Sequence, residues 1–387
     1  MRTIGVITAG RSDYGIYLPV LRRIRACPGL RLHLVVTGSH LAGDRGKTID
    51  EIRRDGFVVG DCVDMLPAAD TARGVVEAMG EGMKALARIY ARRRLDLLLV
   101  LGDRFEMHTA VAAAVPYSLP VAHLHGGEIT EGAMDELFRH SITKMSHLHF
   151  TATKRYRDRL LRMGEEAWRV KVTGAPALDN LREMRLLTRF QVERKTGMKL
   201  DRPPLLATFH PVTLEPDRVS CQIEEILAAL GRAGLPVLFT YPNVDMGSRV
   251  IIRAVQHFVD AHPGCRFAPN LGTPLYFSVM KYAAAMVGNS SSGIIEAASF
   301  GLPVVNIGNR QGGRVHGRNV VDVACERTRI LAAIRRVTGT AFRRQIKGLR
   351  NPYGDGRAAG KIVQILRTIP LNQRLMVKKF QDVQERG

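Results

Sequence analysis

The sequence predicts an α/β protein built from two doubly wound parallel-sheet domains that face a cleft. Short strands that are apolar throughout alternate with helical stretches, and the same pattern restarts after a polar segment at residues 188–204. Strands that are apolar on both faces are typical of parallel sheets covered by helices on both sides. The length of 387 residues is enough for two domains with separate cores.

The first domain is expected over residues 1–187 and should resemble a Rossmann-type unit. Each apolar run is short enough for a strand and is followed by a longer amphipathic stretch. The predicted strands are residues 3–8, 32–37, 95–101, 121–124 and 148–151, with helices at 18–26, 75–93 and 106–115.

The second domain is expected over residues 204–355, after a boundary at Pro203 and Pro204. A further helix within residues 356–387 should pack back on the first domain, and the polar tail at 372–387 is expected to be frayed. The predicted strands of the second domain are residues 205–209, 237–241, 285–288 and 304–307.

The net charge of +21 raises the question of a nucleic-acid partner. The basic residues are spread over nearly every predicted helix, and no aromatic ladder or nucleic-acid-binding motif accompanies them. We therefore expect solvated helix faces and no nucleic-acid partner. A generally positive protein would also attract an anionic substrate.

Other features of the composition point to a cytoplasmic protein without a membrane partner. No apolar run reaches the roughly 18 residues needed to span a bilayer, and the N-terminus shows no secretory signal. The five cysteines are scattered and include no C-x-x-C pair. This pattern favours reduced thiols over a disulfide framework or a zinc site.

Polar motifs follow the predicted strands, where ligands of open parallel sheets bind. In "TAGRSDYG" (8–15), Gly10 permits a tight turn, and Arg11 beside a helix N-terminus would suit a phosphate. An ordinary turn with an exposed arginine is the alternative. In "GDRFE" (102–106), Asp103 and Arg104 stand at a strand end, although Asp103 could instead cap the next helix.

The densest polar cluster is "HLHGGEITEGAMDELFRHSITK" at residues 123–144. His125 and Glu128 border a Gly-Gly pair that lets the backbone approach a ligand, so they are favoured as site residues. His123, flanked by apolar residues, is expected to be structural. Asp135 and Arg139 are further candidates, but they could simply lie on a helix surface. No spacing here is a strong metal signature.

The second domain carries "FHPVT" and "TYPNVD", which place His210 and Asn243 after strands. The stretch "GNSSSGIIEA" (288–297) puts three serines between two glycines at the start of a predicted helix. Hydroxyl and N–H groups there could cradle a diphosphate. A serine-rich helix cap is the alternative, and it accounts for one serine more easily than for three. Arg310 and Arg314 follow in "NIGNRQGGR".

These motifs, together with "NPYGDG", resemble in order those of the hydrolysing UDP-N-acetylglucosamine 2-epimerases of bacterial sialic- and legionaminic-acid pathways. The resemblance extends from about residue 8 to about residue 368. It implies a GT-B-like fold, no metal and no nicotinamide cofactor, and a homodimer or homotetramer. It also implies hydrolysis of UDP-N-acetylglucosamine to free N-acetylmannosamine and UDP.

The resemblance also implies roles for individual residues. Asp103, Glu128 and Asp135 match acidic positions associated with the sugar chemistry, with His125 or His210 assisting. Related enzymes carry a glutamate where this sequence has His125, so the division of labour between His125 and Glu128 stays open. The positions implied for binding the nucleotide part are Arg11, Arg104, Asn243, Ser290, Ser291, Gly293, Glu296 and Arg310.

Elementary chemistry explains why acids and anion-binding groups are both needed. The C2 proton of the sugar is not next to a carbonyl, so direct removal is too costly. Loss of UDP from C1 together with this proton gives a glycal, to which water can add with inversion at C2. Alternatives are the same chemistry on a UDP-2,4-diacetamido-trideoxyhexose or a GDP-linked sugar, a GT-B glycosyltransferase, and a non-catalytic nucleotide-sugar sensor.

Overall fold

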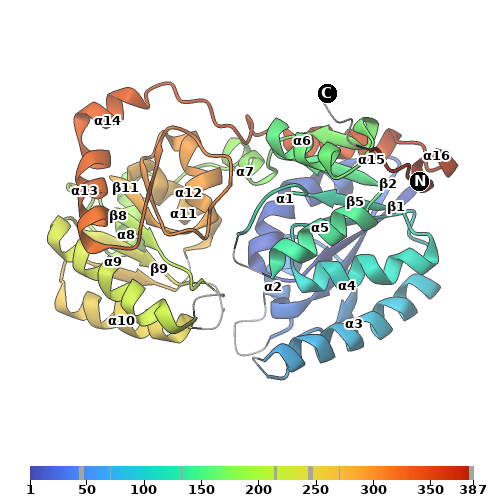
Figure 1. The fold of residues 1–387 in the computed structure, drawn as a ribbon, viewed down its shortest axis with the longest axis horizontal. Helices are drawn as coiled ribbons and strands as arrows, with labels where there is room; N and C mark the ends of the chain where they lie inside the picture. Colours follow the sequence, from blue (N-terminus) through green and yellow to red (C-terminus); the bar gives the residue numbers. More distant parts are fainter. Residues whose placement is uncertain are drawn as a thin grey trace. The chain divides into compact units, whose positions relative to one another are not determined.

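The computed structural model describes residues 1–42, 48–69, 71–131, 134–212, 216–242, 247–269 and 271–382 of the chain. The chain divides into two compact units (Figure 1). Unit 1 comprises Met1–Glu128, Met134–Asn180 and Tyr353–Gly387, and unit 2 comprises Ile129–Ala133 and Leu181–Pro352. A short piece of chain between two segments of unit 1 thus belongs to unit 2.

The described residues of unit 1 form a seven-stranded sheet in the order β3-β2-β1-β4-β5-β6-β7. All of its neighbouring strands pair in parallel, as expected for strands that are apolar on both faces. The strands are β1 (Arg2–Thr8), β2 (Leu30–Thr37), β3 (Val59–Val63), β4 (Leu97–Leu101), β5 (Val121–Leu124), β6 (Leu148–Thr151) and β7 (Val170–Val172).

Helices cover both faces of this sheet. On one face, α1 and α15 bury side chains such as Tyr17 and Ile362 in a common apolar cluster. On the other face, Leu86, Ala110 and Ile142 belong to a cluster shared by α3, α4 and α5. The helices of unit 1 are α1 (Arg11–Ala26), α2 (Ile49–Arg54), α3 (Ala72–Arg92), α4 (Phe105–Ala114), α5 (Asp135–Met145), α6 (Lys154–Arg162), α7 (Ala177–Glu183, which continues into unit 2), α15 (Ala358–Thr368) and α16 (Gln373–Met376).

The C-terminal segment of unit 1 corrects the expectation of a frayed tail. In residues 372–382, Leu375 is buried. The fully buried guanidinium of Arg169 donates hydrogen bonds to the carbonyl oxygens of Arg374, Leu375 and Val377 at 2.7–2.9 Å. Composition suggested a solvated tail, but a buried arginine far away in sequence supplies partners for its backbone.

The described residues of unit 2 form a six-stranded parallel sheet in the order β10-β9-β8-β11-β12-β13. An apolar cluster of this unit includes side chains from α9, α10, α13 and α14, for example Ile223 and Ile334. The strands are β8 (Leu205–Thr208), β9 (Val237–Thr240), β10 (Arg266–Ala268), β11 (Ala285–Gly288), β12 (Val304–Ile307) and β13 (Val320–Val323). The helices are α8 (Arg189–Thr196), α9 (Val219–Ala233), α10 (Ser248–Ala261), α11 (Gly272–Tyr282), α12 (Ser291–Ile295), α13 (Arg327–Thr338) and α14 (Thr340–Gln345).

Both units confirm the predicted class of doubly wound, parallel-sheet α/β folds. In each sheet the strand order reverses next to the first strand, between β1 and β4 in unit 1 and between β8 and β11 in unit 2. Such a reversal leaves a crevice at the carboxyl ends of the two strands, where ligands of these folds bind. Within the described ranges, no helix is both long and apolar enough to span a bilayer.

Candidate functional site

The candidate residues follow the strands that border the reversal of strand order in each unit. In unit 1, Arg11 follows β1 and Asp103 follows β4, while in unit 2, His210 follows β8 and Ser290 follows β11. The polar motifs therefore lie where a doubly wound fold binds its ligands. The two sets of residues are described in turn.

Arg139 organises the acidic residues of unit 1. It lies on the second turn of α5, its residue is 2% exposed, and it forms an ion pair with Asp103. Its Nη1 also donates a hydrogen bond to the carbonyl oxygen of His125 at 2.9 Å. The alternative that Arg139 is a helix-surface residue is therefore wrong, because its guanidinium is buried between two site segments.

His125 and Glu128 form a buried pair beside Gly126 and Gly127. The Nδ1 atom of His125 lies 2.5 Å from Oε1 of Glu128, and the two residues are 6% and 2% exposed. His125 has a φ of +61°, in the left-handed region that residues other than glycine seldom adopt. Its Nε2 is buried without a hydrogen-bond partner among the described residues. Within the described residues, the pair thus leaves Nε2 of His125 without a hydrogen bond.

Asp135 begins α5 and has an unusual affinity for its proton. Burial, followed by repulsion from Asp103, raises the pKa of Asp135 to about 6, although Arg104 and Arg139 oppose the shift. Arg104 is itself held by Glu106, through hydrogen bonds of 3.0 Å from Nε and 2.7 Å from Nη2. The carboxyl group of Asp135 therefore holds a proton at higher pH than that of an ordinary aspartate.

Asp13 is a further buried carboxylate, which motif reading missed. Its Oδ2 accepts hydrogen bonds from the N–H of Ala9 at 2.7 Å and from Oγ1 of Thr8 at 3.1 Å. Burial raises the pKa of Asp13, whereas the charge of Arg104 lowers it. The signal in the sequence for Asp13 was its place in the "RSD" of the first motif.

The predicted Arg11 is more exposed than Asp13, and its Nε lies 3.5 Å from Oε2 of Glu51.

His123 has the structural role expected from its apolar neighbours. Its ring nitrogens lie 2.7 Å from the carbonyl oxygen of Gly102 and 3.2 Å from Oγ1 of Thr143. Burial lowers the pKa of His123 to about 3, so the ring is neutral near pH 7. It ties β5 to the end of β4 and to α5, which fixes the segments carrying Asp103 and Arg139.

In unit 2, Asn289 ties together the ends of β8 and β11. Its side chain accepts from the N–H of His210 at 2.7 Å and donates to the carbonyl oxygen of His210 at 2.8 Å. Burial, aided by the positive charge of Arg310, lowers the pKa of His210 well below its usual value. The imidazole is therefore neutral near pH 7. Sequence reasoning missed Asn289 because the neighbouring serines stood out as the phosphate-like feature.

The serine-rich turn is built around a close approach of two strands. Gly288 has a φ of +136°, and a Cβ there would lie 1.8 Å from the carbonyl oxygen of Thr208. Ser290 then caps α12 by accepting a hydrogen bond from the N–H of Ser292 at 3.4 Å. Gly293 packs against Val304, whose Cγ1 would be 3.0 Å from an added Cβ. Gly288 is thus required by the close approach of the two backbones, whereas Gly293 leaves room for the side chain of Val304.

The helix after the serine-rich turn is short. α12 ends at Ile295, and a 3₁₀ helix, η6 (Ala297–Phe300), follows Glu296. The hydroxyl of Tyr276, from α11, hydrogen-bonds with Ser290 and Ser292, while burial raises the pKa of Tyr276 to about 12. Tyr276 is a further candidate residue that motif reading missed, because it comes from a separate helix.

Arg310 and Gln311 complete the polar turn of unit 2. Arg310 donates from Nη1 to the carbonyl oxygen of Asn289 at 3.3 Å, and Gln311 donates to the same oxygen at 2.9 Å. Glu296 is buried, and its charge helps to raise the pKa of Tyr276. Ser291 opens α12. The remaining predicted residue, Asn243, lies outside the described residues.

The segment after Glu128 belongs to unit 2 and contacts the loop that follows β12. The guanidinium of Arg314 donates from Nε to the carbonyl oxygen of Ile129 at 2.9 Å and from Nη2 to Oγ1 of Thr130 at 3.2 Å. An added Cβ on Gly312 would lie 2.8 Å from the carboxylate of Glu131. The guanidinium of Arg314 therefore binds the segment at residues 129–130 of this chain.

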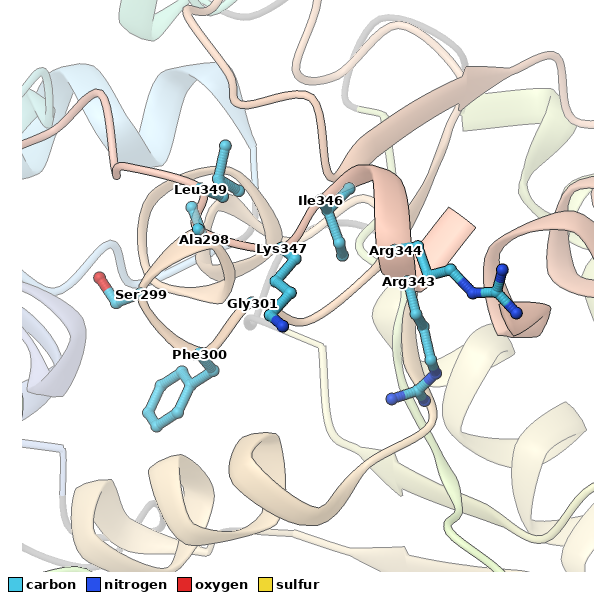
Figure 2. Close-up of a pocket in the computed structure, with 10 residues that line it drawn as sticks. Ala298, Ser299, Phe300, Gly301, Arg343, Arg344, Ile346, Lys347 and Leu349 are labelled. Carbon is cyan, nitrogen blue, oxygen red and sulfur yellow. The ribbon is translucent and has the colours of Figure 1, made fainter. Parts of the chain in front are cut away.

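Two pockets of unit 2 fall partly or wholly outside the predicted motifs. One, of about 520 Å³, lies between η6 and residues 343–349, and its lining includes Arg343, Arg344 and Lys347 (Figure 2). The other, of about 180 Å³, is lined by Phe209 and Asn309 among others, next to the ends of β8 and β12. Among the described residues, no group of three His, Cys, Asp or Glu side chains is arranged to hold a metal ion.

Comparison with known proteins supports the reading of these motifs. Residues 22–367 match the family described as UDP-N-acetylglucosamine 2-epimerase. The chain is 36% identical to a UDP-N,N'-diacetylbacillosamine 2-epimerase (hydrolyzing) of Legionella pneumophila, over 98% of this chain and 99% of that protein. It is 33% identical to polysialic acid biosynthesis protein P7 of Escherichia coli, over 100% and 98% of the two chains.

A solved structure of a protein with a similar name has the same fold as this chain. The crystal structure of a UDP-GlcNAc 2-epimerase from Neisseria meningitidis bound to UDP-GlcNAc matches with a TM-score of 0.83, at 18% identity, over 95% of this chain and 99% of that one. At this identity the match shows the shared fold, whereas the sequence matches show the family. The chain therefore belongs to the UDP-N-acetylglucosamine 2-epimerase family.

Proposed function

We infer that this protein is a hydrolysing 2-epimerase that converts UDP-N-acetylglucosamine and water to N-acetylmannosamine and UDP. The observation that carries the proposal is that the two units present different kinds of side chain at their strand ends. Unit 1 gathers carboxyl groups after β4 and β5, among them Asp135 with its raised pKa, while unit 2 gathers hydroxyl, amide and guanidinium groups at the end of β11. A sugar nucleotide needs both sets of groups.

The first step is the elimination of UDP. A base takes the C2 proton, the C1–O bond breaks with its electron pair leaving on the diphosphate, and a C1–C2 double bond forms. We assign the role of base to Asp103, which is paired with Arg139, or to Glu128, which is paired with His125. A tuned carboxylate can supply such a base.

The second step is the addition of water to the glycal. The water oxygen bonds to C1 while the water gives up a proton to a carboxylate, and a proton is delivered to C2 from the face opposite to the one that the first proton left, which inverts that centre. Asp135 is the carboxyl group best suited to donate a proton, because its pKa of about 6 keeps part of it protonated near neutral pH. The neighbouring Asp103 favours this division, since two close carboxylates resist double ionisation.

The groups of unit 2 are suited to the nucleotide part of the substrate. Neutral His210, the hydroxyls of Ser290 and Ser291, and the guanidinium of Arg310 provide donors for phosphate oxygens. Glu296 can accept hydrogen bonds from the two ribose hydroxyls. Stabilising the departing diphosphate lowers the barrier to elimination, because negative charge develops on that group as the C1–O bond breaks.

A second candidate substrate is favoured by a specific observation. The relative that acts on UDP-N,N'-diacetylbacillosamine is 36% identical over nearly the whole chain. The reaction at C1 and C2 is the same for both sugars, which differ at C4 and C6. Incubation with each UDP sugar, followed by proton NMR of the released sugar, tests the proposal. We expect a free sugar with inverted C2 from one of them; release of neither would contradict a hydrolysing epimerase.

A further inference from the structure

Arg139 is placed to control two site segments at once. One guanidinium nitrogen, Nη2, pairs with Oδ2 of Asp103, which follows β4. The other terminal nitrogen, Nη1, holds the backbone carbonyl oxygen of His125, which follows β5. The arginine thus links the end of one strand to the end of its neighbour from a third element, α5, and it is shielded from solvent while doing so.

The contact with His125 occurs at an unusual point of the backbone. At a φ of +61°, a side chain with a Cβ is strained, and such a conformation persists only where the surroundings hold it. The hydrogen bond from Arg139 to the His125 carbonyl oxygen is one such restraint. The same backbone turn brings Nδ1 of His125 within 2.5 Å of Glu128, so the restraint also acts on the His125–Glu128 pair.

We propose that Arg139 is a positioning residue that sets the placement of Asp103 relative to the His125–Glu128 pair. The inference rests on the proposed function for its catalytic meaning. Arg139 itself neither gives nor takes a proton in this scheme, because a guanidinium stays charged at all relevant pH values. Its two donors lie in one plane, a geometry that a lysine ammonium cannot reproduce.

The geometry distinguishes this role from simple structural support. Arg169 is an equally buried arginine of unit 1, but its guanidinium donates to backbone carbonyl oxygens of the C-terminal segment and pairs with Glu166. None of these groups is a candidate for the sugar chemistry. Replacing Arg169 should therefore lower stability without altering the chemical step, which makes it the matched control.

The test compares Arg139→Lys and Arg139→Met with Arg169→Lys by steady-state kinetics on the full chain. For Arg139→Lys we expect kcat to fall about 30-fold or more with KM changed less than threefold, since displacement of reacting groups by about 1 Å can cost 100-fold. Asp135 is flanked by the charges of Asp103, Arg104 and Arg139. Loss of one positive charge in Arg139→Met should therefore move the limb of the pH–rate profile that belongs to Asp135 to higher pH. Arg139→Lys should leave that limb in place.

The outcomes separate the possibilities. If Arg139→Lys keeps kcat within threefold of the parent, or if the Arg169→Lys control loses kcat equally, Arg139 is a stability residue and the proposal is wrong. Partial recovery of Arg139→Ala by guanidinium chloride, but not by potassium chloride at equal ionic strength, would support positioning.

A second readout does not depend on turnover. The ring ¹⁵N shifts of His125, assigned by comparison with His125→Gln, report its tautomer and its hydrogen bond to Glu128. Arg139→Lys should change these shifts, and Arg169→Lys should not. Unchanged shifts in Arg139→Lys would overturn the positioning role even if the parent protein turned over neither UDP sugar. Absence of turnover in the parent would instead count against the proposed function alone.

Discussion

The Nδ1 atom of His125 lies 2.5 Å from Oε1 of Glu128, and both side chains are buried at the end of β5. The two side chains are hydrogen-bonded to each other, while the second ring nitrogen of His125 has no hydrogen-bond partner in the described part of the chain. The hydrogen bond joins His125 and Glu128, the two residues whose division of labour the sequence left open.

Glu128→Gln should lower kcat by about 100-fold or more, the usual size of an acid–base contribution. The glutamine keeps the volume of the side chain but removes its ability to exchange a proton with His125. A matched control is Glu165→Gln, which disrupts another buried histidine–glutamate pair, with His149 at 3.0 Å, outside the candidate site. The control should lose thermal stability and keep kcat within about threefold. Near-normal turnover of Glu128→Gln would remove Glu128 from the mechanism.

Asp135 should contribute a limb near pH 6 to the pH dependence of kcat/KM. If Asp135 donates the proton to C2, the rate falls as the pH rises through its pKa of about 6, because the proton donor is lost. Asp135→Asn should abolish this limb and lower kcat strongly. A profile of the parent without a limb between pH 5 and 7 would contradict the assignment, and it can be measured with either UDP sugar.

The raised pKa of Asp135 also predicts how the stability of the protein changes with pH. The pKa of Asp135 is higher in the folded protein than its ordinary value of 3.8, so the folded state binds the proton more tightly than the unfolded state. Stability from this group is therefore greatest at low pH and declines as the pH rises from about 4 through 6. Asp135→Asn should melt at a higher temperature than the parent at pH 7, with a smaller difference at pH 4. A lower melting temperature of the variant at pH 7 would contradict the assigned environment.

Arg310→Ala should weaken UDP binding about 10- to 100-fold, the effect of losing a hydrogen bond to a charged group. Isothermal titration with UDP measures this directly. Arg344→Ala is the control, because Arg344 lines the separate pocket near η6 (Figure 2). The control should bind UDP as the parent does. If Arg344→Ala weakened binding and Arg310→Ala did not, the nucleotide would occupy that other pocket.

Gly288→Ala should destabilise unit 2 by about 3 kcal/mol, the upper range for overpacking a core. The added Cβ would lie 1.8 Å from the carbonyl oxygen of Thr208, and a φ of +136° is strained for a residue with a Cβ. Gly80→Ala on α3 is the control, since a Cβ there meets nothing within 4 Å. It should stabilise the protein by about 0.5–1 kcal/mol through helix propensity. Urea unfolding of both variants checks the contrast.

The sequence was sufficient to predict the class of parallel sheet and the strand ends that carry the candidate site, but it missed the edge strands β3, β7, β10 and β13. Strands that are apolar on both faces indicate parallel sheets, and parallel sheets bring their carboxyl ends to one edge. Asp103 and His210 could therefore be placed at strand ends without coordinates. The order of strands in each sheet could not be obtained in this way, because it depends on contacts between segments far apart in the chain.

The sequence did not predict the side chains that hold the candidate site residues in place. Arg139 is buried because Asp103 and the carbonyl oxygen of His125 lie on neighbouring strand ends, a fact of tertiary structure. Asn289 and Tyr276 likewise act through backbone and hydroxyl groups brought together by β8, β11 and α11. Motif reading finds residues that stand out by type, whereas these residues matter through their partners.

The central claim is that UDP leaves by elimination and that water adds to the resulting glycal with inversion at C2. The most direct measurement is turnover of UDP-N-acetylglucosamine, and separately of the diacetamido sugar, in deuterium oxide with NMR of the product. We predict a free sugar of inverted C2 configuration that carries one deuterium at C2. A released sugar that retains its C2 proton would contradict the elimination route and with it the roles proposed for Asp103, Glu128 and Asp135.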